Sequence, residues 1–120
     1  MPASVLVSVV DDDESVREAL PDLLREFGFA TEAFASADAF LRAGALDATK
    51  CLILDIAMPG MTGPELKKIL DSRGLRIPVI FITANANAAR EQALSGAAAC
   101  LVKPFSDTAL LDALKTALKM

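Results

Sequence analysis

The sequence contains no histidine, tryptophan or tyrosine, and its six phenylalanines are its only aromatic residues. Without histidine, the chain cannot use catalytic triads or general bases built on imidazole. Its two cysteines, Cys51 and Cys100, are far apart and lack the paired spacing of a zinc site. We therefore expect both cysteines to be reduced, buried thiols.

The chain also lacks any apolar run close to the roughly 20 residues of a membrane-spanning helix, although 53% of its residues are hydrophobic. Acidic residues begin at position 11, so the N-terminal segment does not have the form of a secretory leader, and we expect a cytoplasmic location. The 12 basic residues are scattered and outnumbered by 16 acidic ones, which argues against direct contact with nucleic acid. The 120 residues predict one domain, 1–120, with no effector domain in this chain.

Continuous apolar runs alternate with segments in which apolar residues recur at helical spacing. Three of these segments begin with N-cap signals, which are Ser36, Ser106 and the pair Thr62 and Glu65. Pro21 interrupts the first helical pattern, but the apolar stripe continues in phase, so we expect a bend and not a break. Five strands alternating with five helices predict an α/β fold with a parallel sheet covered on both faces. The expected strands are 4–10, 30–34, 50–56, 79–83 and 99–102, and the expected helices are about 16–27, 37–43, 63–73, 86–95 and 107–118.

Polar residues follow four of the five expected strands, namely Asp11–Asp13, Asp55, Thr83 and Lys103. Each of these residues, taken singly, has an ordinary structural explanation as a helix cap, a loop residue or an exposed polar residue. Because parallel strands end at one edge of a sheet, where ligands bind in doubly wound folds, we expect these residues to lie together. Asp55 is the strongest candidate, since the preceding segment 51–54 is typical of a strand buried on both faces and a buried carboxylate needs compensation.

Clustered carboxylates must share protons or hold a cation. An all-oxygen ligand set without histidine or cysteine favours Mg²⁺, and Lys103 supplies further positive charge. A metal ion, an ammonium and the small hydroxyl of Thr83 around one carboxylate are the groups that phosphoryl transfer requires. The residues therefore predict that Asp55 accepts a phosphoryl group.

These segments resemble the receiver domain of bacterial two-component response regulators, the CheY-like family, and most closely the FixJ-type receivers. The resemblance lies in Val9–Asp12, Asp55–Gly63, Ile82–Ala84 and Lys103–Phe105, and it spans essentially the whole chain. It implies a doubly wound five-stranded sheet with strand order 2-1-3-4-5 and five helices. It also implies signalling by phosphorylation in place of catalysis on a separate substrate, since such domains catalyse only their own phosphorylation and dephosphorylation.

By position, the resemblance implies that Asp55 is the phosphoacceptor and that the donor is a phosphohistidine of a sensor histidine kinase. It implies that Asp12, Asp55 and the backbone carbonyl of Ala57 bind Mg²⁺ directly, with Asp11 acting through a bound water. Thr83 is implied as the switch hydroxyl that moves toward the phosphoryl group.

Lys103 is implied to pair with the Asp55 carboxylate and later with the phosphate, and the bond from Lys103 to Pro104 is implied to be cis. The sequence departs from the family at Cys100, where an aromatic residue is usual, and the segment from Thr83 to Gly96 is about two residues short. Both departures fall on the face made by the fourth helix, fifth strand and fifth helix. The family uses this face for targets or for dimers, so we expect it to be the output surface and a possible homodimer interface.

Rival interpretations remain. A haloacid-dehalogenase-type phosphatase needs a general acid two residues after Asp55, where this chain has Ala57. A flavodoxin-like nucleotide binder needs a phosphate-binding first loop, which Asp11–Asp13 would repel. A pseudo-receiver that only binds proteins is disfavoured by the complete residue set but is kept open by Cys100 and the short loop. Sequence does not separate a stand-alone regulator from the receiver of a larger protein.

Overall fold

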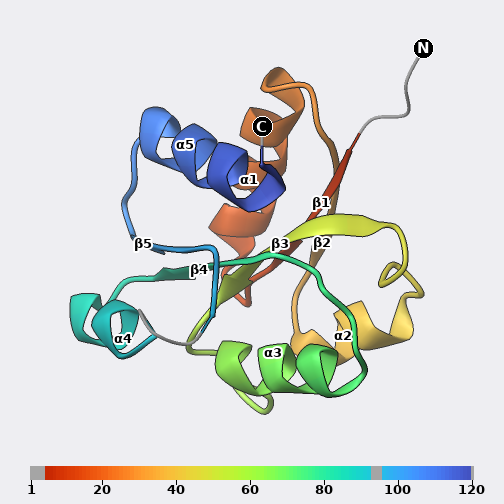
Figure 1. Ribbon diagram of the computed structural model, residues 1–120. Helices are drawn as coiled ribbons and strands as arrows, with labels where there is room; N and C mark the ends of the chain where they lie inside the picture. The colour runs from red at the N-terminus through yellow and green to blue at the C-terminus, as the bar shows by residue number, and fades with distance from the viewer. Residues whose placement is uncertain (1–4, 93–95, 120) are drawn as a thin grey trace.

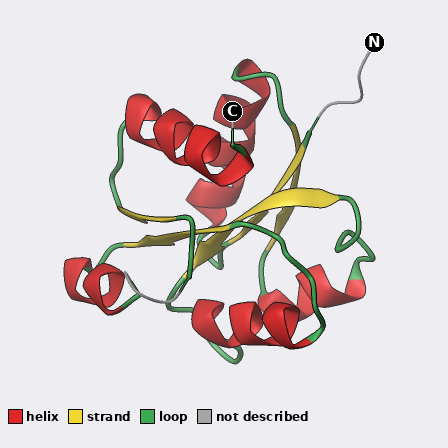
Figure 2. Cartoon of the chain, in the orientation of Figure 1, coloured by secondary structure: helices red, strands yellow, loops and turns green. Residues whose placement is uncertain are grey.

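The computed structural model describes residues 5–92 and 96–119 and shows a five-stranded parallel sheet between two layers of helices (Figures 1 and 2). The strand order is β2-β1-β3-β4-β5, as the resemblance implied. The central strand β3 is buried along nearly its whole length, which explains why its sequence is a continuous apolar run. The strands are β1 Leu6–Val10, β2 Ala30–Phe34, β3 Thr49–Asp55, β4 Val79–Thr83 and β5 Ala99–Val102.

Helices α1 and α5 cover one face of the sheet, and α2, α3 and α4 cover the other (Figure 1). The predicted caps are confirmed, because Ser36 and Ser106 accept hydrogen bonds at the starts of α2 and α5. Thr62 and Glu65 form a reciprocal capping box at the start of α3. The helices are α1 Glu14–Glu26, α2 Ala37–Arg42, α3 Gly63–Ser72, α4 Ala86–Glu91 and α5 Asp107–Leu118.

Each face of the sheet has its own apolar core, because alternate side chains of each strand point to opposite faces. Val9, Ile53 and Ile82 pack with α1 and α5, and Leu54 and Phe81 pack with the helices on the other face. Burial on both sides leaves the carboxyl ends of the strands as the edge at which polar groups collect.

The predicted element boundaries need small corrections. The first strand was expected from residue 4, which lies outside the described residues, and β1 begins at Leu6. Strand β3 runs from Thr49 to Asp55, one residue earlier than expected. Helix α4 ends at Glu91, short of the expected 95, and residues 93–95 lie outside the described residues. Helix α1 continues unbroken through the buried Pro21.

None of the helices in residues 5–92 and 96–119 has the length and apolar character needed to cross a membrane. Cys51 is buried as predicted, and burial raises the pKa of its thiol to about 12. The prediction of a buried Cys100 is wrong, because this residue is only half-buried and lines a groove between α4 and β5.

Candidate phosphoacceptor and metal site

The strand register brings the predicted site residues together. Val10 pairs with Leu54 across β1 and β3, so the next residue of each strand, Asp11 and Asp55, lie side by side. Asp55 in turn pairs with Ile82 of β4. The loop after β1 and the end of β3 therefore meet at the edge of the sheet where α/β folds bind ligands.

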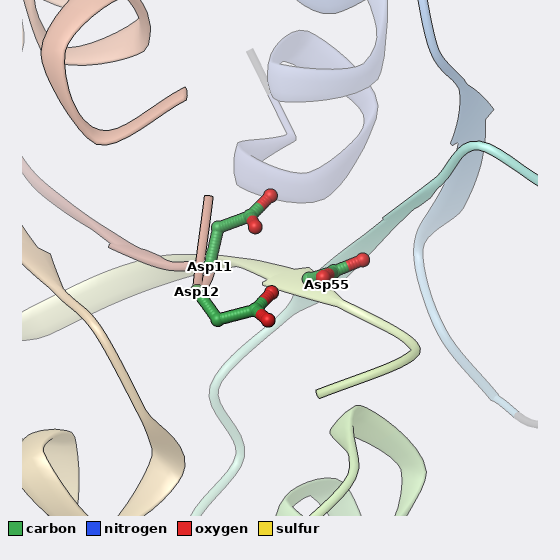
Figure 3. A group of neighbouring side chains, drawn as sticks. All are labelled: Asp11, Asp12 and Asp55. Atoms are coloured by element: carbon green, nitrogen blue, oxygen red, sulfur yellow. The ribbon is translucent and has the colours of Figure 1, made fainter. Parts of the chain in front are cut away.

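Three carboxylates gather at this edge (Figure 3). One ligand oxygen from each of Asp11, Asp12 and Asp55 lies within 4.8 Å of the others. Asp11 is fully buried and Asp55 is 6% exposed, whereas Asp12 is open to solvent. Asp11 and Asp55 therefore form the buried part of the cluster, and Asp12 forms its solvent-exposed part.

Lys103 enters the same cluster from the end of β5. Its Nζ lies 2.8 Å from Asp11 Oδ2 and 3.9 Å from Asp55 Oδ1. The expected pairing with Asp55 is therefore secondary to a hydrogen-bonded ion pair with Asp11. The bond from Lys103 to Pro104 is cis, as the resemblance implied.

The charges in the cluster shift the pKa values of its members. Burial, followed by the negative charge of Asp11, raises the pKa of Asp55 to about 7, and Lys103 only partly offsets these effects. Burial alone would lower the pKa of the Lys103 ammonium, but the hydrogen bond to Asp11 and the nearby carboxylates raise it. Lys103 thus stays charged near neutral pH, while Asp55 is poised to gain or lose its proton.

Thr83 ends β4, one residue beyond the partner of Asp55, and is 3% exposed. Its Oγ1 accepts a hydrogen bond from the backbone N–H of Asn85 at 3.1 Å. The Asn85 side chain in turn caps α4. The Thr83 hydroxyl is therefore hydrogen-bonded to the N-cap residue of α4, which lies two residues further along the chain.

Two other predicted residues lie in the loops of the site. Ala57 is exposed in the segment after β3, two residues beyond Asp55. Asp13 is the N-cap of α1, and its carboxylate accepts hydrogen bonds from the backbone N–H and the hydroxyl of Ser15. These bonds lower the pKa of Asp13, led by the bond from the Ser15 hydroxyl.

The side chains present fit a hard divalent cation. The three clustered groups offer only oxygen atoms, and two of them are buried beside a single ammonium. Three carboxylates lie beside one ammonium, so the ionised cluster has more negative charge than Lys103 neutralises. Carboxylate oxygens with room for water on the exposed side are the ligand set that Mg²⁺ prefers.

Gly63 and Arg17 also belong to this region. Gly63 ends one of the segments that carry the resemblance, but neither residue was assigned a role from the sequence alone. The first turn of α3 lies directly against the end of β3, and the Gly63 N–H donates to the Ile56 carbonyl at 3.0 Å. A Cβ at position 63 would overlap the Asp55 carbonyl oxygen and lie 3.1 Å from the Asp55 carbonyl carbon. A glycine in the first turn of a helix was the available signal, because glycine is a poor helix former.

Replacing Gly63 with alanine is expected to destabilise the protein by about 1–3 kcal/mol, because the methyl group must displace the Asp55 backbone. Urea unfolding followed by circular dichroism measures this change. Thr62→Ala is the control, since it removes the α3 cap at a cost of about 1 kcal/mol and leaves Asp55 in place. A Gly63→Ala protein as stable as wild type would show that the close approach is not restrictive.

Comparison with known proteins identifies the family of the chain. Residues 7–115 match the family model described as the response regulator receiver domain. The chain is 42% identical over 120 residues to the transcriptional regulatory protein FixJ of Azorhizobium caulinodans, covering 98% of this chain and 57% of that protein. The chain therefore spans little more than half the length of this relative.

Solved structures give the same assignment. The crystal structure of a response regulator receiver protein from Burkholderia phymatum is 43% identical, with a TM-score of 0.81 over 96% of this chain and 95% of that one. The structure described as FixJ-N is 35% identical, with a TM-score of 0.85 over 99% of this chain and 96% of that one. The chain belongs to the response regulator receiver domains of bacterial two-component systems, and it is similar to the FixJ-type receivers.

Proposed function

We propose that Asp55 accepts a phosphoryl group from a phosphohistidine of a sensor histidine kinase, in a reaction that depends on Mg²⁺. The observation that carries this proposal is the position of Asp55. It is a nearly buried carboxylate at the end of the central strand, beside two more carboxylates and 3.9 Å from an ammonium. Asp12, Asp55 and the Ala57 carbonyl would hold the metal directly, and Asp11 would hold it through water.

The transfer needs the ionised form of Asp55. One of its oxygens forms a bond to phosphorus as the bond from phosphorus to the donor nitrogen breaks, and the electron pair of that bond stays on the imidazole. When bound, Mg²⁺ neutralises charge on the phosphoryl oxygens and favours the ionised Asp55. The chain modifies only itself in this scheme. Later attack of water on phosphorus breaks the bond between phosphorus and the Asp55 oxygen, releases inorganic phosphate and returns Asp55 to its carboxylate form.

Lys103 and Thr83 would act on the transferred group. The Lys103 ammonium is already held at the site by Asp11 and lies between the two buried carboxylates, so it can neutralise a phosphoryl oxygen without a large movement. The buried Thr83 hydroxyl ends the neighbouring strand and can donate a hydrogen bond to another oxygen. Thr83 is the last residue of β4, and Lys103 directly follows β5.

Incubation with acetyl phosphate tests this proposal without a kinase. Intact mass spectrometry is expected to show one added phosphate on the wild-type protein in Mg²⁺ and none in EDTA. Asp55→Asn removes the nucleophile and is expected to add none in either buffer. An unlabelled wild-type protein would favour the pseudo-receiver interpretation, and a labelled Asp55→Asn protein would place the acceptor elsewhere.

We further propose that phosphorylation changes the surface of α4, β5 and α5, where a partner or a second copy binds. Thr83 is connected to α4 through the Asn85 cap, and the neighbouring groove of about 490 Å³ is lined largely by small side chains. Val102 of β5 lines the same groove and is 39% exposed, which is unusual for a large apolar residue in this structure. Small side chains leave room for α4 to shift.

Beryllofluoride, a stable mimic of the phosphoryl group, tests the proposed output surface. Backbone amide chemical shifts are expected to change in α4 and β5 as well as beside Asp55. The Thr83→Ala protein lacks the connecting hydroxyl, so its changes are expected to stay near Asp55. Wild-type changes confined to the loops around Asp55 would contradict an output surface on α4 and β5.

A further inference from the structure

Asp11 is the most completely bonded residue of the site. Its carboxylate accepts hydrogen bonds from Lys103 Nζ at 2.8 Å and from the Asp13 N–H at 2.9 Å. Its own N–H donates to the Phe34 carbonyl at 3.1 Å. Its carbonyl oxygen accepts from Nη1 of Arg17 at 3.0 Å. Every polar atom of this fully buried residue therefore has a partner, and the partner of the carbonyl is a side chain from α1.

The carbonyl of Asp11 belongs to the peptide plane that joins Asp11 to Asp12. Six atoms of a peptide unit move as one rigid plane, so a bond that fixes this oxygen also fixes the direction in which the chain enters Asp12. Asp11 lies one residue beyond the paired part of β1, and only its N–H side is still held by the sheet, through the bond to Phe34 of β2. The Arg17 hydrogen bond holds the carbonyl side.

We infer that Arg17 is a positioning residue for the metal site: by holding the peptide plane between Asp11 and Asp12, it directs the Asp12 carboxylate toward Asp55. Arg17 is half-buried on α1 and reaches six residues back along the chain. Its guanidinium is always charged and presents its donors in a fixed plane, which suits a lasting hydrogen bond to one carbonyl oxygen. This inference rests on the proposed Mg²⁺ site.

A purely electrostatic role for Arg17 makes the opposite prediction. A guanidinium that only offsets negative charge would repel Mg²⁺, so its removal would tighten metal binding. The contact is with a backbone carbonyl, and in the described part of the chain no carboxylate forms an ion pair with Arg17. Geometry thus favours positioning, and the sign of the change in Mg²⁺ affinity distinguishes the two roles.

The test compares Arg17→Met, which removes the donors and keeps an apolar stem, with Arg17→Lys, which keeps a charge and a donor. Arg25→Met is the matched control, because Arg25 is an exposed residue of the same helix and forms an ion pair with Asp22 at 2.7 Å, away from the Asp11 carbonyl. Isothermal titration calorimetry is expected to show Mg²⁺ binding weakened by about tenfold in Arg17→Met, an effect of the size seen when a residue that hydrogen-bonds to a metal ligand is removed. Arg17→Lys is expected to recover most of the affinity, and Arg25→Met to match wild type.

Amide hydrogen exchange of the metal-free proteins supplies a second reading. The Asp13 N–H, bonded to the Asp11 carboxylate, is expected to exchange faster in Arg17→Met, while amides of β3 keep their protection. Unchanged or tighter Mg²⁺ binding, or an unchanged Asp13 N–H, would overturn the inference. Should Arg17→Met fail to fold, Arg17→Gln is measured in its place. Failure of wild-type Mg²⁺ binding and labelling would instead overturn the proposed function.

Discussion

The Lys103→Met protein is expected to lose about 3–5 kcal/mol of its free energy of unfolding without metal, because the substitution leaves the fully buried Asp11 carboxylate without its ion-pair partner. Lys103 Nζ donates to Asp11 at 2.8 Å, and methionine retains the length of the side chain but not the ammonium. Urea unfolding in EDTA, followed by circular dichroism, measures the loss. The chain has no tryptophan or tyrosine to report by fluorescence.

Two controls isolate the buried ion pair. Lys50→Met makes the same substitution at an exposed position of β3 and is expected to change stability by no more than about 0.5 kcal/mol. Addition of Mg²⁺ is expected to stabilise Lys103→Met more than wild type, since the metal supplies the missing positive charge to the site. A loss in Lys103→Met no larger than that in Lys50→Met would contradict the role assigned to the pair.

The metal-free protein is expected to lose stability as the pH rises from about 4 to 7. The pKa of Asp55 is about 7 in the folded protein and near its ordinary value of 3.8 in the unfolded chain. The folded state therefore binds more protons across this interval, and the contribution of Asp55 is full below pH 3.8 and lost as the pH passes through 7. One such proton changes the free energy of unfolding by at most about 1.4 kcal/mol per pH unit.

Asp55→Asn isolates this contribution, because the amide does not titrate. The variant is expected to be more stable than wild type at pH 8 in EDTA and to approach it at pH 4. Mg²⁺ at pH 8 is expected to stabilise wild type strongly and the variant weakly, since the variant lacks one metal ligand. Parallel stability curves for the two proteins between pH 4 and 8 would contradict the raised pKa of Asp55.

The sequence predicted the parts of the fold that depend on local chemistry. The buried strand before Asp55 and the caps at Ser36, Thr62 and Ser106 follow from short patterns with a direct physical cause. The ends of parallel strands meet at one edge, so the convergence of Asp11, Asp55 and Lys103 followed from the strand assignment alone.

The missed features depend on how separate elements meet. Gly63 matters because α3 begins against the Asp55 backbone, and a glycine in the first turn of a helix signals an unusual position without naming the backbone that it approaches. Arg17 reaches the Asp11 carbonyl across a loop whose conformation sequence periodicity does not describe. The nearer partner of Lys103 is Asp11 and not Asp55, and this difference depends on the three-dimensional positions of residues from three strand ends.

Chemical trapping of the modified residue tests the central claim most directly. Borohydride reduces an aspartyl phosphate to homoserine, which peptide mass spectrometry locates in the chain. After treatment with acetyl phosphate and Mg²⁺, homoserine is predicted at position 55 and is predicted to be absent when EDTA replaces Mg²⁺. Homoserine at position 11 or 12 while Asp55 remains unmodified would contradict the assignment of Asp55 as the phosphoacceptor.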